Sequence, residues 1–323
     1  MKIVVLDGYT LNPGDLSWEG IERLGALTLY ERTAATAVPE RAAGADILLT
    51  NKTPVSKEAL QRLPDLKLIA VTATGYDIVD VETAARNGIP VCNVPVYGTE
   101  SVSQFVFAML LHLCHNVGLH DGAVKSGEWA GCPDWSFWKS PQVLLSGKKM
   151  GIVGFGRIGR RVGELAHAFG MTVMAHDQRT ENPPAYDPFS WESIETLFAA
   201  SDVVTLHCPQ TQENARFINA DLLKEMKPAA ILINTARGGL IDEPALARAL
   251  NGGTLAAAAL DVVSVEPIQE DNPLLKAKNC LLTPHMAWST LGARRRLMEE
   301  TVLNIEAFMK GRPVNVVNSR GVK

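Results

Sequence analysis

The segment GIVGFGRIG, residues 151–159, decides the fold. It contains the spacing G-x-G-x-x-G at Gly154, Gly156 and Gly159, it follows an apolar strand-like run, and it begins a helix-like segment. The next strand-like run ends at Asp177, roughly 20 positions further along, as a dinucleotide-binding βαβ unit requires. The segment therefore predicts a parallel α/β sheet that binds a dinucleotide at the carboxyl ends of its strands.

Each glycine of this motif has its own physical task. Gly154 permits the tight turn, Gly156 lets the backbone approach a pyrophosphate, and Gly159 lets the helix pack closely on the strand. The pyrophosphate then meets the amides at the start of the helix, around Arg157 and Ile158. The alternative interpretation is a glycine-rich turn that serves packing only.

Asp177 predicts which dinucleotide binds. Its carboxylate would accept hydrogen bonds from the hydroxyls of the adenosine ribose and would repel a 2′-phosphate. Arg179 works against this preference, because a guanidinium there could pair with a 2′-phosphate. The sequence therefore favours NAD over NADP, and it leaves the strictness of that preference open.

Strand-like and helix-like runs alternate along the chain, which predicts parallel sheets covered by helices. The strand-like runs are short and rich in Val, Ile, Leu and Ala, as expected when both faces of a sheet are covered. The alternation restarts near residue 148, so we expect two successive α/β domains. The predicted strands, one of them with its following turn, are residues 2–7, 45–51, 66–72, 89–94, 148–156, 172–177, 202–207, 229–235, 255–262 and 279–283.

Two long helices are predicted outside these alternating units. Residues 100–119 are apolar nearly all round, so we expect one helix that is buried on more than one side, connects the domains and contacts a second subunit. The last helix is predicted over residues 290–310, with Ser289 as its cap. Its run Arg294–Arg296 is expected on a solvated face.

Composition limits the class of protein. The chain has 323 residues, of which 46% are hydrophobic and 20% charged, and this excludes a disordered or fibrous chain. A formal net charge of −4 gives no support to nucleic-acid binding. We find neither the roughly 18-residue apolar run of a membrane span nor a signal peptide. Because the five cysteines are scattered without a C-x-x-C pair, we expect a cytoplasmic protein without disulfides or a bound metal.

Polar side chains follow three of the predicted strands, where a core would not accept them. Ligands of open α/β sheets bind beyond the carboxyl ends of the strands, so Arg237, Glu266 and His285 could converge beside a nicotinamide ring. Arg237 offers a fork of donors to a carboxylate or keto oxygen, His285 can give a proton to a forming alkoxide, and Glu266 can orient the imidazole. Asp261 is placed to hold the nicotinamide amide. Each residue alone could be structural, and their common sheet edge favours the catalytic hypothesis.

These motifs together resemble the D-isomer-specific 2-hydroxyacid dehydrogenase family, over essentially the whole chain. The resemblance implies NAD as the cofactor, a homodimer, and an Arg–Glu–His catalytic set. It implies two doubly wound parallel-sheet α/β domains, with a Rossmann NAD-binding domain (residues 100–287) inserted into a flavodoxin-like substrate domain (residues 1–99 and 288–323). The motifs that carry it are residues 151–159 with Asp177, His207-Cys208-Pro209, residues 234–239, Asp261 with Glu266-Pro267, and Thr283-Pro284-His285.

The resemblance also assigns binding residues. The backbone amides around Gly75 would face the carboxylate of the substrate. The cofactor would be bound by Gly154, Gly156, Arg157, Ile158, Gly159, Asp177, Cys208, Pro209, Thr235, Ala236 and Asp261. The substrate would be bound by Asn51, Lys52, Thr74, Gly75, Tyr76, Arg237 and His285.

Within the family, the sequence looks most like the glycerate dehydrogenases, also called hydroxypyruvate reductases. The similarity lies in residues 51–53, 72–77 and 285–290, where Trp288 marks the subgroup. Glu266 argues against formate dehydrogenases, which carry Gln at that position. The sequence near Thr74 lacks the Lys of phosphite dehydrogenases, which argues against that branch too.

We therefore expect hydride transfer between NADH and C2 of a short 2-keto acid, with hydroxypyruvate and D-glycerate as the favoured pair. A glyoxylate reductase or a D-lactate-type enzyme is the nearest alternative. A dinucleotide-sensing protein similar to transcriptional corepressors is the alternative from another class.

Three of the six tryptophans, Trp129, Trp135 and Trp138, lie close together in the sequence. They predict either a small core under a loop or an arm that crosses a dimer and reaches the site of the partner.

Overall fold

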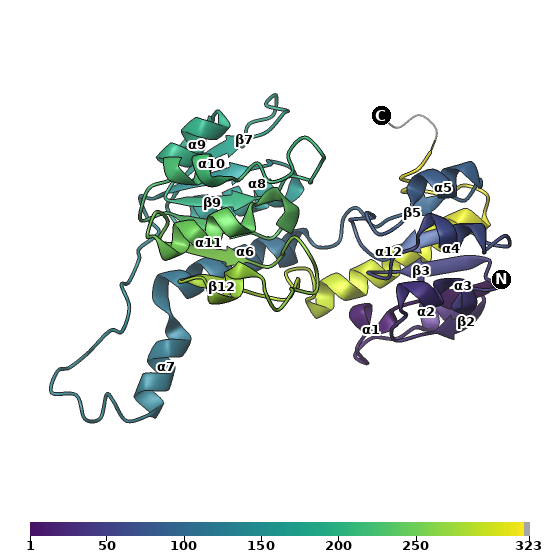
Figure 1. Ribbon diagram of the computed structural model, residues 1–323, viewed down its shortest axis with the longest axis horizontal. Coiled ribbons are helices and arrows are strands. Elements are labelled where there is room, and N and C mark those ends of the chain that lie inside the picture. The colour runs from purple at the N-terminus through teal and green to yellow at the C-terminus, as the bar shows by residue number, and fades with distance from the viewer. Residues whose placement is uncertain (320–323) are drawn as a thin grey trace. The chain divides into compact units, whose positions relative to one another are not determined.

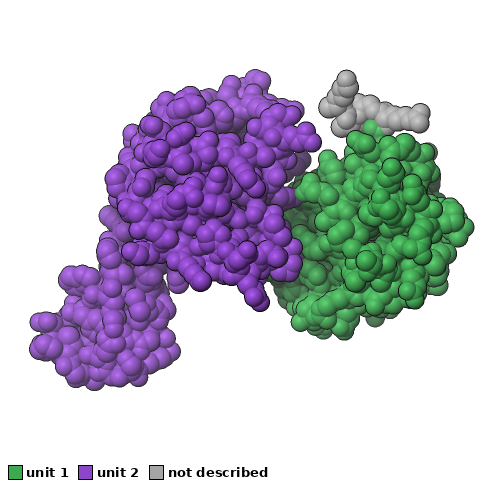
Figure 2. All heavy atoms as spheres, in the orientation of Figure 1, with its two compact units in different colours: residues 1–98, 289–323 green, residues 99–288 purple. Residues whose placement is uncertain are grey.

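The computed structural model describes residues 1–319 (Figure 1). The chain divides into two compact units (Figure 2). Unit 1 comprises residues 1–98 and 289–323, and unit 2 comprises residues 99–288. Residues 320–323, which the sequence analysis assigned to the substrate domain, lie outside the described residues.

Unit 1 is built on a parallel sheet that has five strands within residues 1–319, in the order β2-β1-β3-β4-β5. This is the doubly wound order of flavodoxin. Alternate strand residues feed two separate cores, one around Val4 and Leu48 and the other around Ile3 and Ile47, because helices cover both faces. Its elements are β1 (Lys2–Val5), α1 (Gly8–Leu11), α2 (Glu19–Glu22), β2 (Ala26–Leu29), η1 (Ala35–Ala37), α3 (Val38–Arg41), β3 (Ile47–Thr50), α4 (Lys57–Gln61), β4 (Leu68–Val71), α5 (Val81–Arg86), β5 (Val91–Cys92) and α12 (Leu291–Met309).

Unit 2 is built on a parallel sheet that has seven strands within the described chain, in the order β12-β11-β10-β9-β6-β7-β8. Its first six strands in chain order follow the Rossmann arrangement 3-2-1-4-5-6, and β12 extends the edge. This confirms the predicted α/β fold of two parallel sheets. The elements of unit 2 are α6 (Thr99–His115), α7 (Val117–Lys125), β6 (Lys149–Val153), α8 (Arg157–Ala168), β7 (Thr172–His176), β8 (Phe189–Trp191), α9 (Ile194–Ala200), β9 (Val203–Leu206), α10 (Ala220–Glu225), β10 (Ile231–Asn234), η2 (Gly238–Leu240), α11 (Glu243–Asn251), β11 (Ala257–Leu260), η3 (Pro273–Lys276) and β12 (Cys280–Leu282).

The long helix expected over residues 100–119 is confirmed as far as His115 and is interrupted at Asn116, so the prediction of one continuous helix is wrong at its end. Asn116 has a φ of 45°, in the left-handed region, which ends α6 at His115 and starts α7 in a new direction. In Figures 1 and 2, α7 and the segment after it extend away from the sheet of unit 2. We call residues 117–144 the arm.

The last helix also differs from its prediction at its first turn. Thr290, not Ser289, caps it, because the hydroxyl of Thr290 accepts the amide of Ala293. Arg294 is not solvated, since only 8% of it is exposed and its guanidinium donates to both carboxylate oxygens of Asp15 at 2.6 and 2.7 Å. Three consecutive arginines look alike in the sequence, so the burial of Arg294 beside the exposed Arg295 and Arg296 could not be predicted.

Within residues 1–319, no single helix combines the length and apolar composition of a membrane span. Helices α6 and α7 meet that test only as a pair, bent by 53°. The same part of the chain holds no group of three His, Cys, Asp or Glu placed to bind a metal.

Candidate active site

The turn between β6 and α8 has the geometry that its three glycines predict. Gly154 has a φ of 90°, and a Cβ on it would lie 2.5 Å from the backbone nitrogen of Cys208. A Cβ on Gly159 would lie 2.1 Å from the carbonyl oxygen of Gly154, so helix and strand touch there. Around Gly156 nothing lies within 4 Å of such a Cβ. The turn is therefore closed on its protein side and open at Gly156.

Asp177, directly after β7, ties this turn to the next strand. Its Oδ2 accepts the amide of Phe155 at 2.6 Å and its Oδ1 accepts the amide of Arg179 at 3.0 Å. The carboxylate borders an open pocket of about 440 Å³, and Arg179 lines the same pocket. The carboxylate of Asp177, which favours NAD, and the guanidinium of Arg179, which favours NADP, thus border one pocket. The pocket is lined by Phe155, Gly156, Arg160, Asp177, Gln178, Arg179, Glu181 and Asn182.

The His207-Cys208-Pro209 segment follows β9 and lies against the glycine turn through Cys208. Burial lowers the pKa of His207 to about 3 and raises the pKa of the Cys208 thiol to about 11. Both side chains are therefore uncharged at neutral pH and form a neutral wall beside the turn.

The loop after β10 carries Arg237 and is shaped by one buried amide. Asn234 is fully buried, and its side chain accepts the amide of Ala236 at 2.9 Å and donates to the carbonyl of Arg237 at 2.8 Å. The hydroxyl of Thr235, in the same loop, is buried and has no hydrogen-bond partner in the part of the chain that the structure describes. A buried hydroxyl of this kind needs a partner, and a bound ligand can supply one.

Glu266 and His285, from the loops after β11 and β12, form a pair. Glu266 Oε2 lies 2.6 Å from His285 Nδ1, and the two side chains are 34% and 23% exposed. Because the carboxylate occupies Nδ1, Nε2 is the ring nitrogen left for exchange of a proton with a ligand. His285 has a φ of 52°, so its backbone is held in the left-handed region, which residues other than glycine rarely adopt.

Asp261 builds the loop that holds His285 in this conformation. The carboxylate is 1% exposed and accepts Thr283 Oγ1 at 2.6 Å and the amides of Met286 and Ala287 at 2.9 and 2.8 Å. Its main-chain oxygen accepts the amide of His285 at 2.8 Å. Burial raises the pKa of Asp261, and these hydrogen bonds oppose that rise. Both carboxylate oxygens are engaged by the loop, and its contact with the nicotinamide amide stays a prediction.

In unit 1, the predicted substrate-binding residues follow β3 and β4. The buried carboxylate of Asp7, after β1, accepts the consecutive amides of Asn51, Lys52 and Thr53 at 2.8, 2.6 and 2.7 Å. After β4, the side chain of Asn93 donates to the carbonyl of Thr74 at 2.7 Å. Gly75 and Tyr76 continue that second loop. The two loops are thus fixed at the carboxyl end of the sheet of unit 1.

The family model of the D-isomer specific 2-hydroxyacid dehydrogenase, NAD binding domain, matches residues 107–287. A hydroxypyruvate reductase of Blautia hydrogenotrophica is 50% identical over 98% of this chain and 100% of its own length. The chain belongs to the D-isomer specific 2-hydroxyacid dehydrogenase family. It is an NAD-dependent oxidoreductase of 2-hydroxy and 2-keto acids, which confirms the predicted class of enzyme and its cofactor.

Two further proteins are similar to this dehydrogenase. A glycerate dehydrogenase of Methylorubrum extorquens is 39% identical over 90% of this chain and 91% of its own. The solved structure of a D-lactate dehydrogenase from Aquifex aeolicus, complexed with NAD and lactic acid, superposes with a TM-score of 0.87 at 28% identity. That superposition covers 99% of this chain and 100% of the other, so the fold is common to both over their full lengths.

The residues present in this dehydrogenase fit NAD. The open space at Gly156 leaves room for a pyrophosphate beside the first amides of α8, at Arg157 and Ile158. The unpartnered hydroxyl of Thr235 and the pocket beside Asp177 provide further polar contacts. We assign the pyrophosphate to the glycine turn and the adenosine to the pocket on this basis.

Sequence reasoning missed Asp7, and it placed Asn234 in a motif without recognising that this residue shapes the loop of Arg237. Each stands at or just beyond the end of an apolar strand, where a small polar side chain can reach the amides of the next loop. A polar residue that ends a buried strand is the signal that could have found them.

Proposed function

We propose that this dehydrogenase reduces hydroxypyruvate to D-glycerate with NADH. The observation that carries the proposal is the 2.6 Å contact between Glu266 and His285 at the strand ends of a sheet that belongs to an NAD-binding domain. The named activities of the Blautia and Methylorubrum relatives favour hydroxypyruvate and glycerate among short 2-keto and 2-hydroxy acids.

In this mechanism, bound NADH supplies a hydride to C2 of the keto acid. His285 donates the proton on Nε2 to the oxygen of C2, so the carbonyl becomes a hydroxyl and the imidazole becomes neutral. Glu266 orients the ring through Nδ1 and stabilises its protonated form before the transfer. In the reverse direction, neutral His285 removes the hydroxyl proton as hydride leaves C2.

Binding of the substrate carboxylate is assigned to Arg237 and to the loop amides of unit 1. The planar guanidinium of Arg237 matches a carboxylate or a keto oxygen with two parallel donors. The amides of Thr74, Gly75 and Tyr76, together with Asn51 and Lys52, complete the proposed set. Arg237→Lys is therefore expected to raise KM for the keto acid strongly, because a point charge does not replace the fork.

The test is a kinetic comparison of wild type and His285→Ala on a panel of hydroxypyruvate, glyoxylate and pyruvate. We expect hydroxypyruvate to have the highest kcat/KM, and His285→Ala to lower kcat by about 10²–10⁴-fold with NADH affinity retained. A preference for glyoxylate or pyruvate would replace the proposed substrate. NADH binding without turnover of any keto acid would favour the dinucleotide-sensing alternative.

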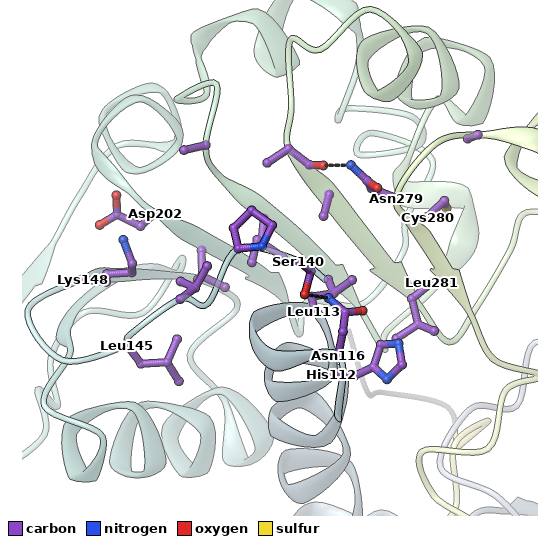
Figure 3. A pocket seen from close by; sticks show the side chains of 18 residues that line it. His112, Leu113, Asn116, Ser140, Leu145, Lys148, Asp202, Asn279, Cys280 and Leu281 are labelled. Atoms are coloured by element: carbon purple, nitrogen blue, oxygen red, sulfur yellow. Dashed lines mark hydrogen bonds between the residues drawn. The ribbon is translucent and has the colours of Figure 1, made fainter. Parts of the chain in front are cut away.

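We further propose that the enzyme is a homodimer in which the arm covers a groove on the partner. The arm exposes much apolar surface: Trp135 is 91% exposed, Leu144 is 74% exposed and Trp138 is 70% exposed. A pocket of about 500 Å³ lies where β9 to β12 begin, against the end of α6 and against Ser140, Pro141 and Val143 at the end of the chain's own arm (Figure 3). Leu113 and Leu281 give it an apolar lining, as an arm rich in tryptophan requires.

Sedimentation or light scattering tests the dimer, and Trp138→Ala tests the reach of the arm. We expect a mass of two chains. A loss of kcat/KM in Trp138→Ala with the dimer intact would place the arm at the active site of the partner instead of in this groove. A wild-type kcat/KM leaves the arm as an interface only, and a monomer refutes the homodimer.

The proposed location is the cytoplasm. All five cysteines, which lie within residues 1–319, are free, as a reducing compartment permits. Fractionation of cells that express the native chain, with an antibody against it, measures this directly.

A further inference from the structure

Glu243 is a buried carboxylate that has no part in the reaction proposed above. It is the first residue of α11 and is 7% exposed. Its Oε1 accepts the amide of Ser264 at 2.5 Å, and its Oε2 accepts Ser264 Oγ at 2.8 Å and Asn272 Nδ2 at 2.9 Å. All three donors are neutral and belong to residues 263–272. One carboxylate on a rigid helix thus fixes a single loop at two places.

The loop that Glu243 holds is the one that carries Glu266. Ser264 lies two residues before Glu266, and the amide of Val263 donates to Glu266 Oε1 at 3.3 Å. The other oxygen of Glu266 contacts His285. Two consecutive amides of this loop therefore donate to two different carboxylates, that of Ser264 to Glu243 and that of Val263 to Glu266.

The same peptide also supports the segment that carries Arg237. A Cβ on Gly238 would lie 1.9 Å from the carbonyl carbon of Val263 and 2.4 Å from the nitrogen of Ser264. The backbone after Arg237 is therefore in direct contact with the Val263–Ser264 peptide, at a distance that only glycine allows. Any movement of this peptide changes the spacing between the Arg237 segment and Glu266.

We propose that Glu243 is a positioning residue for the reaction: by holding the Val263–Ser264 peptide, it keeps Glu266 against His285 and keeps the Arg237 segment at its working distance. This inference rests on the proposed function. A carboxylate suits the task because it accepts three hydrogen bonds, and the positive end of the α11 dipole stabilises its charge. A glutamine has one acceptor oxygen, and its amide group would face donors of the loop.

The test compares Glu243→Gln with the matched control Glu195→Gln. Glu195 also lies in the first turn of a helix of unit 2, α9, but its side chain is exposed and bonds only at the start of its own helix, where Ser193 is the cap. For Glu243→Gln we expect kcat to fall about 10- to 100-fold with NADH affinity unchanged, as a small displacement of catalytic groups produces. The decline of kcat with rising pH should begin at a lower pH, because a displaced Glu266 stabilises the imidazolium less. The control should match the wild type in kcat, in NADH affinity and in pH profile.

A second variant covers the case in which Glu243→Gln folds poorly, as judged by its Tm and circular dichroism. Ser264→Ala keeps the amide donor and removes only the hydroxyl, so it leaves Glu243 in place. We expect it to shift the pH profile in the same direction by a smaller amount. A Ser264→Ala enzyme whose kcat and pH profile equal those of the wild type would overturn the inference.

His285→Ala, measured in the same assay, separates the two proposals. If it is inactive while Glu243→Gln has the kcat and pH profile of the wild type, the positioning role is wrong and the proposed function stands. If Glu243→Gln lowers kcat without moving the pH profile, its role is general stability and the inference is wrong. If His285→Ala keeps wild-type kcat, the proposed catalytic set is wrong, and the inference with it.

Discussion

A buried aspartate holds a loop at the carboxyl end of the sheet in each unit, but the two loops differ. In unit 1, Asp7 accepts three consecutive amides of a loop in ordinary backbone geometry, Asn51 to Thr53. In unit 2, the carboxylate of Asp261 accepts one hydroxyl and two amides around His285. The φ of His285 is 52°, which is unfavourable for any residue with a Cβ. The same device fixes a relaxed segment in one case and a strained one in the other. We expect the strained loop to depend more on its aspartate.

Asp261→Ala is the strongest test of this difference. It removes the acceptor of three hydrogen bonds, so the loop can relax and carry His285 away from Glu266. We expect kcat to fall by about 100-fold or more, and the free energy of unfolding to fall by about 1–3 kcal/mol per donor left buried. Steady-state kinetics and urea unfolding measure the two effects. A variant with kcat near that of the wild type would show that the strain of the loop is held by other contacts.

Asp7→Ala is the matching change in unit 1. It frees the amides of Asn51, Lys52 and Thr53 and lets the proposed substrate loop move, without touching the Glu266–His285 pair. We expect KM for hydroxypyruvate to rise about tenfold, which corresponds to about 1.4 kcal/mol, with kcat at saturation close to that of the wild type. A fall in kcat as large as that of Asp261→Ala would remove the distinction between the two loops.

The glycine turn of unit 2 sharpens the comparison, because close backbone contacts at Gly154 and Gly159 shape it in addition to the carboxylate of Asp177. Gly159→Ala would force a Cβ against the carbonyl oxygen of Gly154, so we expect it to destabilise the fold by about 1–3 kcal/mol. Gly156→Ala meets open space, so we expect normal stability and weaker NADH binding. Thermal unfolding and fluorescence titration with NADH separate these outcomes. Equal losses of stability in both variants would contradict the assignment of separate tasks.

His207 provides the smallest test, and it concerns acid. Burial lowers its pKa to about 3, below the ordinary 6.5, so between these values the unfolded chain binds a proton that the folded chain does not. Stability therefore falls as the pH falls through this range, by up to about 1.4 kcal/mol per pH unit for this one group. Urea unfolding of wild type and His207→Gln between pH 7 and 5 measures it. We expect a flatter slope in His207→Gln, and an unchanged slope would contradict the effect of burial.

Much of the fold could be predicted from sequence because buried parallel strands are continuous apolar runs. The strands β3, β4, β9 and β10, buried at every residue, lie inside predicted ranges. The strands β2 and β8 were missed, because these edge strands are only partly buried and lack such a run.

The candidate site divides in a similar way. Glycine spacing and polar residues after strands leave a local signal, so Gly154, Asp177, Glu266 and His285 could be named from sequence. The contacts that shape the loops could not be predicted. A polar residue after a strand marks Asp7 as a candidate, but the partners of Asp7 and Glu243 are distant in sequence and only the tertiary fold brings them together. The break at Asn116, which separates α6 from α7, left a weak signal that the apolar run around it outweighed, since asparagine forms helices poorly and adopts the left-handed conformation more readily than most residues.

The pocket of Figure 3 and the glycine turn lie at opposite ends of the sheet of unit 2. A strand such as β9, with four residues at about 3.3 Å each, separates them by roughly 13 Å. Under the proposed dimer, substitutions at Ala256 or Leu281 are therefore expected to change the assembly of the chain while the hydride chemistry stays as it was. Because of this separation, the amino ends of the strands are the place to engineer new assemblies or attach reporters. Residues at one end of the sheet can also change during evolution without disturbing the other end.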